Sequence, residues 1–257
     1  MNNVQYVSGA INPGDCVSGA WSLVTRRFGL YIGVGLVTLI LIACIPFVGS
    51  ILFGPVIGGF YYLVLRDARD EPVDFGMMFK GFERFLPLML AGVIQAAPSL
   101  ILTVVQYTAD IARLVGVSRG GDANFYQPSR DAVFAGISAG IMIVIVVLTL
   151  LAAVWSVALS FAVPLILEHD LGVVDALLTS AKAAFSNIGG LIVLVILEAL
   201  VGILGVIALC IGIFVAIPVI YAANVLAYRM VFPYFERSNI NMSPPPPEAY
   251  GNFGQGM

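Results

Sequence analysis

The feature that most constrains this chain is a stretch of 38 residues, 28–65, that contains no charged side chain. Long apolar runs recur later in the sequence, and only 11% of the 257 residues are charged. Soluble domains usually have about 25% charged residues. A water-soluble globule cannot bury so much continuous apolar sequence, so we expect the chain to lie in a lipid bilayer.

The apolar runs predict an all-α, polytopic integral membrane protein. A bilayer core of about 30 Å requires about 20 apolar residues per helix, and about 17 is the lower limit. The runs divide into six crossings, at about 29–45, 50–66, 85–108, 132–168, 188–208 and 211–232.

Three of these crossings leave alternatives open. The first two are short and Pro55 lies inside the second, so this hairpin either crosses the bilayer or re-enters on the same side. The fourth run is longer than one crossing requires, which indicates a tilted helix or a break at Pro164.

The distribution of Lys and Arg predicts the orientation. Six crossings place both termini on one side, and the loops and ends on that side hold nine of the 12 Lys and Arg residues. Cytoplasmic loops are enriched in these residues. We therefore expect a multi-pass protein of a plasma (inner) membrane with both termini in the cytoplasm. The net charge of −3 gives no reason to expect nucleic acid as a partner.

A long-range match in the sequence indicates an internal repeat. Residues 54–66 (GPVIGGFYYLVLR) and 217–229 (IPVIYAANVLAYR) share Pro-Val-Ile, a Leu and a final Arg at an offset of 163 positions. Upstream, an offset of 160 pairs Asp15 with Asp175 and Gly29 with Gly189. Such self-similarity is typical of duplication, and both units begin and end on the cytoplasmic side, so we predict parallel repeats.

These patterns predict the organisation of the whole chain. A disordered leader occupies 1–14, a six-helix membrane domain 15–235, and a disordered, Pro-rich cytoplasmic tail 238–257. Within the membrane domain, the two repeat units are 15–66 and 175–229, and a middle hairpin lies at 74–168.

A short amphipathic segment precedes each predicted hairpin. After Asp15, Asp74 and Asp175, apolar residues recur at helical spacing with polar residues opposite. Each Asp is placed to accept hydrogen bonds from free N–H groups at a helix start. We expect three hairpins, each introduced by a short helix at the cytoplasmic membrane surface.

Five cationic residues are predicted to lie at that surface: Arg26, Arg27, Arg66, Lys182 and Arg229. Long cationic side chains near span ends extend to the membrane interface, so anchoring is their ordinary role. Binding of lipid phosphate is the alternative.

Three polar residues are predicted to share one depth in the membrane. Glu198, Gln95 and Thr38 lie ten residues after Ile188, Phe85 and Phe28, respectively, and so about 15 Å from the surface. Hydrogen bonding between helices is one interpretation of this layer. A proton or cation relay is the second, and a protonated, lipid-facing Glu198 without a role is the third.

The glycines within the spans predict close helix packing. Gly29-x-x-x-Gly33 has the spacing of small residues that allow two helix backbones to approach.

The sequence contains few groups for catalysis or metal binding. Glu168-His169-Asp170 is the one cluster with metal-ligating side chains, but its adjacent residues point in different directions on a helix, and no second His exists. Neither a Gly-x-Ser-x-Gly turn nor a phosphate-binding Gly-Lys-Ser/Thr loop is present. We therefore expect no enzyme, no catalytic residue, no cofactor and no metal.

Several short motifs resemble those of uncharacterised bacterial six-helix membrane proteins. They are Gly19-Ala20-Trp21, Ile45-Pro46 with Gly49, Gly54-Pro55, Gly58-Gly59, Phe79-Lys80-Gly81-Phe82, Val163-Pro164-Leu165-Ile166, Asp175-Ala176-Leu177 and Tyr228-Arg229. This group is related to the membrane domain that is fused to some glycerophosphodiester phosphodiesterases, in which a separate soluble domain carries the catalysis. The resemblance covers most of 15–235 and implies a membrane module without assigned chemistry.

The sequence thus predicts a non-enzymatic integral membrane module that organises lipids or partner proteins. Its partners would be membrane lipids and either a second copy of the chain or another membrane protein. The alternative is a small transporter or channel that uses the polar layer around Glu198.

Overall fold

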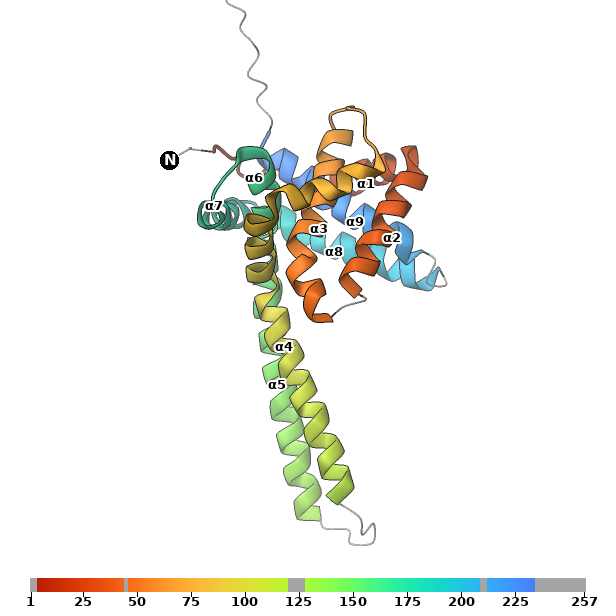
Figure 1. Cartoon of the computed structure of the whole chain (residues 1–257). Helices are drawn as coiled ribbons and strands as arrows, with labels where there is room; N and C mark the ends of the chain where they lie inside the picture. Colours follow the sequence, from red (N-terminus) through yellow and green to blue (C-terminus); the bar gives the residue numbers. More distant parts are fainter. Residues whose placement is uncertain (1–3, 44–45, 120–127, 209–211, 234–257) are drawn as a thin grey trace, which may run out of the picture.

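The computed structural model describes residues 4–43, 46–119, 128–208 and 212–233, and these residues are folded mainly as helices (Figure 1). In chain order the helices are α1 (Pro13–Arg26), α2 (Phe28–Ala43), α3 (Pro46–Asp67), the 3₁₀ helix η1 (Phe75–Arg84), α4 (Phe85–Arg119), α5 (Pro128–Ala158), α6 (Ala162–His169), α7 (Val173–Ser186), α8 (Ile188–Ile207) and α9 (Ile213–Val231). No β-strand occurs in the described residues. The prediction of an all-α fold is confirmed.

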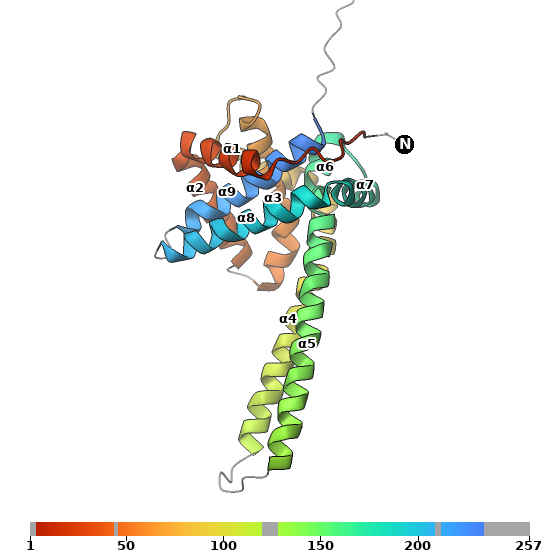
Figure 2. The ribbon, with the colours of Figure 1, turned by 180° about the vertical axis from the view of Figure 1, so that it is seen from behind.

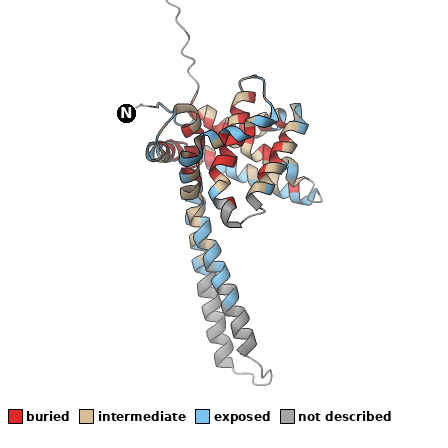
Figure 3. Cartoon of the chain, in the orientation of Figure 1, coloured by how far each residue is buried: buried red, intermediate tan, exposed pale blue. Residues whose placement is uncertain are grey.

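The molecule consists of a body of packed helices and one long projecting hairpin. In two opposite views, α4 and α5 run side by side and extend far beyond the other helices (Figures 1 and 2). The paired helices α8 and α9 lie obliquely to this hairpin in both views. Buried residues concentrate in the body, whereas the described part of the hairpin is largely exposed (Figure 3).

Several helices have the length and apolarity needed to cross a membrane. Four segments qualify within the described residues: Phe75–Thr108, Ile143–His169, Ile188–Ile207 and Ile213–Val231. A fifth span results if α1 and α2, which meet at a bend of 103°, are counted as one. The chain is therefore suited to a multi-pass arrangement. The second predicted crossing, which α3 contains, is not among these segments.

The three predicted leading segments form separate short helices, α1, η1 and α7. Asp74 caps η1, since its carboxylate accepts a hydrogen bond from the Gly76 N–H at 2.7 Å. The capping positions of α1 and α7 are instead occupied by Asn12 and Gly172. Asp15 and Asp175 lie in the first turns of these two helices, where a carboxylate still complements the helix dipole.

The starts of four helices recur at one spacing along the sequence. Helices α7 and α8 begin at Val173 and Ile188, each 160 positions after the first residues of α1 and α2. The buried faces correspond as well, because the buried residues Cys16, Ala20 and Val24 of α1 match Ala176, Ser180 and Ala184 of α7. This spacing is the offset found in the sequence.

The helices of the projecting hairpin differ in length from their predicted spans. Helix α4 continues to Arg119, well beyond the predicted end near residue 108. The fourth predicted run is broken, which is one of the two alternatives that the sequence left open. The break does not lie at Pro164, because α5 already ends at Ala158. Pro164 lies in the first turn of α6, where a missing N–H costs no hydrogen bond.

Helix α3 packs against its neighbours through glycine. A Cβ atom added to Gly59 would lie 1.6 Å from the Met78 carbonyl oxygen, and one added to Gly54 would lie 1.8 Å from that of Leu88. The backbone of α3 therefore touches both η1 and α4. Gly29 and Gly33 make no such close approach within the chain, since a Cβ at Gly29 would have no atom within 4 Å, and one at Gly33 would meet only the Phe75 ring, at 3.5 Å. An approach of these glycines to a second copy of the chain stays a prediction.

The expectation that residues 1–14 are a disordered leader is corrected by the structure. From residue 4 onward the leader packs on the body, and the Val7 N–H donates to the Val231 carbonyl oxygen at 2.9 Å. Ile11 is buried and belongs to the core. The predicted Pro-rich tail at 238–257 lies outside the described residues.

Candidate functional site

A small polar cavity lies where the α4–α5 hairpin meets the body. Its volume is about 210 Å³, and α3, α4, α5, α8 and α9 all contribute to its wall. Its polar side chains are Tyr61, Gln95, Ser156, Ser160, Glu198, Tyr221 and Asn224. Glu198 is the one charged residue in the lining.

The geometry of the cavity is set by a contact between α8 and α9. Glu198 Oε1 accepts a hydrogen bond from Asn224 Nδ2 at 2.7 Å. The same amide nitrogen also donates to the Ile220 carbonyl oxygen at 3.0 Å. Both amide protons of Asn224 are thus used, and its Oδ1 is left as an acceptor. Among the described residues, no donor bonds to Glu198 Oε2 or to Asn224 Oδ1.

Two tyrosines from α3 and α9 also line the cavity. The rings of Tyr61 and Tyr221 meet edge to face, with their centroids 6.1 Å apart. This arrangement is favourable for aromatic pairs. It keeps two hydroxyl-bearing side chains beside the Glu198–Asn224 pair.

The structure brings together two of the three residues of the predicted polar layer. Gln95 and Glu198 line the same cavity, but Thr38 does not. Thr38 is buried in α2, and its hydroxyl has no hydrogen-bond partner among the described residues. Asn224, the direct partner of Glu198, was not predicted as a member of the layer. The sequence signal that could have found it is the predicted hairpin of 188–208 and 211–232, which places the two helices that carry Glu198 and Asn224 side by side.

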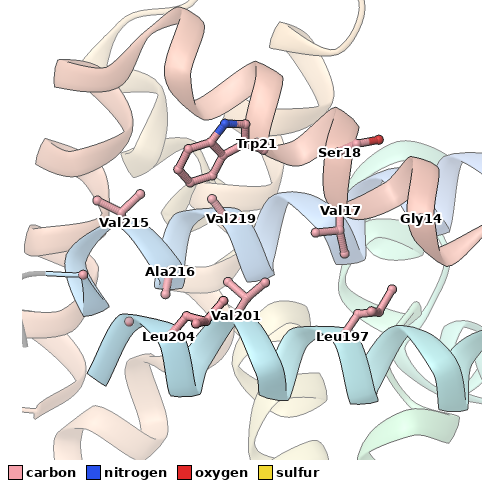
Figure 4. Close-up of a pocket in the computed structure, with 12 residues that line it drawn as sticks. Gly14, Val17, Ser18, Trp21, Leu197, Val201, Leu204, Val215, Ala216 and Val219 are labelled. Carbon is pink, nitrogen blue, oxygen red and sulfur yellow. The ribbon is translucent and has the colours of Figure 1, made fainter. Parts of the chain in front are cut away.

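A larger, apolar groove lies between α1, α8 and α9 (Figure 4). Its volume is about 730 Å³. The lining residues are Gly14, Val17, Ser18, Trp21, Leu197, Val201, Leu204, Gly205, Gly212, Val215, Ala216 and Val219. No charged residue contributes to this lining.

The amphipathic helix α1 forms one wall of the groove. In the close-up the Trp21 ring points toward α9, and the Ser18 hydroxyl points away from the apolar side chains (Figure 4). Trp21 is 55% exposed, so its ring lies at the rim and not in the core. An indole at a rim suits a boundary between apolar and polar surroundings.

A buried acid organises the charged end of the molecule. Asp67, at the end of α3, is fully buried and accepts hydrogen bonds from Arg26 and from the Tyr31 hydroxyl, each at 2.8 Å. The Arg27 guanidinium lies 3.2 Å from the same carboxylate. Arg26 also pairs with the exposed Asp70 at 2.7 Å. This cluster joins the bend between α1 and α2 to the end of α3.

Further ion pairs connect the loops at this end. Arg66 pairs with Glu71, Arg69 with Glu168, and Arg84 with Asp170. Of the five predicted surface cations, Arg26, Arg27 and Arg66 are therefore held by acids. Lys182 and Arg229 form no ion pair within the part of the chain that the structure describes.

The charged end provides no metal site in the described residues. No group of three or more His, Cys, Asp or Glu side chains comes together there that could hold a metal ion. Glu168, the first member of the Glu-His-Asp cluster, pairs with Arg69.

No family model, curated protein or solved structure matches this chain. The function is therefore inferred from two features of the described residues, the groove and the polar cavity.

Proposed function

We propose that this chain is a non-enzymatic integral membrane module that holds a lipid acyl chain in the groove between α1, α8 and α9. The observation that carries the proposal is the groove itself, an uncharged recess of about 730 Å³ whose wall includes an amphipathic helix. This volume is within the range of small-molecule sites, about 300–1,000 Å³.

The surroundings of the groove favour an acyl chain as its occupant. Two of its walls, α8 and α9, are helices that could cross a membrane. In the hydrocarbon layer the available apolar molecules are lipid tails, which can fill an apolar recess without leaving a polar group unpaired. Trp21 at the rim is suited to the zone where tails give way to head groups.

The proposed topology has six crossings in three hairpins, with the first and third hairpins as parallel repeats. The common spacing of 160 between helix starts supports the repeat. The distribution of Lys and Arg supports cytoplasmic termini and an inner-membrane location. The resemblance to bacterial six-helix membrane modules agrees with this proposal.

The proposal can be tested with a lipid that carries a photoactivatable group on its acyl chain. Val201 lies in the groove, and Val201→Trp would fill it with an indole. Ile203 is a matched control, since it is on the same helix, is 55% exposed and does not line the groove. We expect cross-linking at groove residues to fall at least about fivefold in Val201→Trp and to be retained in Ile203→Trp.

Equal cross-linking of both variants at the groove residues would reject the proposal. The proposal would also fail if the wild-type protein cross-linked evenly over all its exposed apolar residues. Mass spectrometry of the cross-linked peptides distinguishes these outcomes.

A further inference from the structure

We infer that the cavity at Glu198 binds one monovalent cation, coordinated by the carboxylate and amide oxygens of Glu198 and Asn224. This site is separate from the lipid groove and does not depend on the function proposed for it. The argument rests on the charge of the cavity, its unused acceptors and its position between helices.

The charge of the cavity favours a single positive charge. Glu198 is its one charged lining residue, and it lies on α8, a helix that could span a membrane. An unpaired carboxylate in such surroundings is costly, and a monovalent cation makes the site neutral. A divalent ion would leave one positive charge uncompensated, and sites for such ions usually have several carboxylates.

The hydrogen bonds leave oxygen acceptors, not donors, unused. Asn224 Nδ2 donates to both Glu198 Oε1 and the Ile220 carbonyl oxygen, so the orientation of the amide is fixed. Glu198 Oε2 and Asn224 Oδ1 have no donor in the described residues. Two free oxygens of this kind are the ligands that hard cations take.

Other groups in the lining can complete the coordination. The side chains of Gln95 and Ser156 form no hydrogen bond with another described residue. The Ser160 hydroxyl donates to the Val157 carbonyl oxygen at 2.9 Å, so its lone pairs stay available. A volume of about 210 Å³ also holds water molecules beside an ion, since each water in the liquid takes about 30 Å³.

The repeat predicts one site per chain. The position that matches Glu198 in the first unit, at the offset of 160, is Thr38, and the position that matches Asn224, at the offset of 163, is Tyr61. A hydroxyl replaces the carboxylate in that unit, so no anion is available to hold a second ion.

The position of the cavity predicts a stabilising effect of the ion. The lining joins α8 and α9 to the α4–α5 hairpin. A ligand that binds only the folded state stabilises it by RT ln(1 + [L]/Kd), so the melting temperature rises with the logarithm of the ligand concentration above Kd. The proton competes for the same carboxylate. The other titratable groups near Glu198 are Tyr61 and Tyr221 in the cavity and Cys16 on α1, all uncharged at acidic pH.

The first experiment measures thermal unfolding of the purified protein in a non-ionic detergent. Choline chloride is replaced by LiCl, NaCl or KCl at constant ionic strength. At least one of these salts should raise Tm by about 5 °C at neutral pH, with a logarithmic dependence on its concentration and a smaller effect at acidic pH. Glu198→Gln should abolish the ion effect, and Glu83→Gln, which removes an exposed acid from η1, should retain it.

The second experiment keeps Glu198 in place, so it remains decisive if Glu198→Gln does not fold. The carboxyl-directed reagent dicyclohexylcarbodiimide should modify Glu198, and the stabilising cation should slow this reaction at least about fivefold. Three results would overturn the inference: equal Tm values in choline and in all three salts, an ion effect that survives in Glu198→Gln, or modification that no cation slows. A site that responds to pH alone would be a proton site and would also overturn it.

Discussion

The side-chain amide of Asn187 donates a hydrogen bond to the carbonyl oxygen of Val7, 180 positions earlier in the chain, at 3.0 Å. In return, the Ala10 N–H donates to Asn187 Oδ1 at 2.9 Å. Asn187 lies between α7 and α8, and Arg27 lies 160 positions earlier between α1 and α2, where it contacts Asp67. In both repeat units, therefore, the residue between the short helix and the following helix contacts a distant segment. Asn187 bonds to the leader, and Arg27 contacts Asp67 at the end of α3.

Replacement of Asn187 by Ala should release the leader from the body. Asn187 is only 3% exposed and makes both bonds to the leader, so its loss should cost about 1–3 kcal/mol. Amide hydrogen exchange should become faster at Val7 and Ala10. Thr25→Ala is a control and should leave this exchange unchanged, because the exposed Thr25 hydroxyl donates only within α1, to Trp21 and Ser22. Unaltered exchange in Asn187→Ala would contradict the role given to this residue.

Loss of the Asp67 carboxylate should destabilise the protein more than loss of the nearby Asp70. Asp67 is fully buried with three partners, and hydrogen bonds to a charged group contribute about 1.5–3 kcal/mol. Asp70 has an 81% exposed side chain, and such surface pairs contribute about 0–1 kcal/mol. Chemical unfolding in detergent should give Asp67→Asn a clearly lower midpoint than Asp70→Asn, because Asn tolerates the positive φ of 57° at residue 70. Equal midpoints would refute the assignment.

A methyl group at Gly59 should separate α3 from η1. The added Cβ would lie 1.6 Å from the backbone oxygen of Met78, and a backbone atom cannot move aside as a flexible side chain can. We expect Gly59→Ala to lower Tm by several degrees. Gly202 is the control, because a Cβ there meets no atom within 4 Å, and Ala should stabilise α8 by about 0.5–1 kcal/mol. Similar Tm values for the two variants would show that the close contact is absent.

The parallel repeat predicts that α3 and α9 end on the same face of the membrane. Single cysteines placed at Asp70, just after α3, and at Arg229, near the end of α9, test this in a background without native cysteine. Both should react with a membrane-impermeant maleimide only after the inner membrane is opened. Reaction of one position in cells with an intact inner membrane would exclude the parallel arrangement.

The positions of most helices could be predicted from the sequence because length and apolarity along the chain determine them. The starts of α2, α4 and α8 differ from the predicted starts by at most one residue. The far end of α4 was placed too early because Asp110 and Arg113 do not end a helix, whereas they do end an apolar run.

The membership of the polar cavity depends on rotation about each helix axis, which depth alone does not determine. Thr38 and Glu198 have the same predicted depth, but only Glu198 lines the cavity that Gln95 also lines. The hydrogen-bond partner of Glu198 is Asn224 on α9, which lies 26 positions later in the sequence. The packed leader depends on even longer contacts, which no local pattern in the first 14 residues could indicate.

The unequal lengths of the helices have a consequence for the far side of the membrane. At 1.5 Å per residue, the 20 residues of α8 extend about 30 Å, whereas the 35 residues of α4 extend about 52 Å. A hydrocarbon layer of about 30 Å, crossed by α4 along the membrane normal, leaves roughly 20 Å of this helix outside it. In the proposed orientation, the far ends of α4 and α5 thus extend into the periplasm, and a protein that approaches from there would touch them before it reached the lipid head groups.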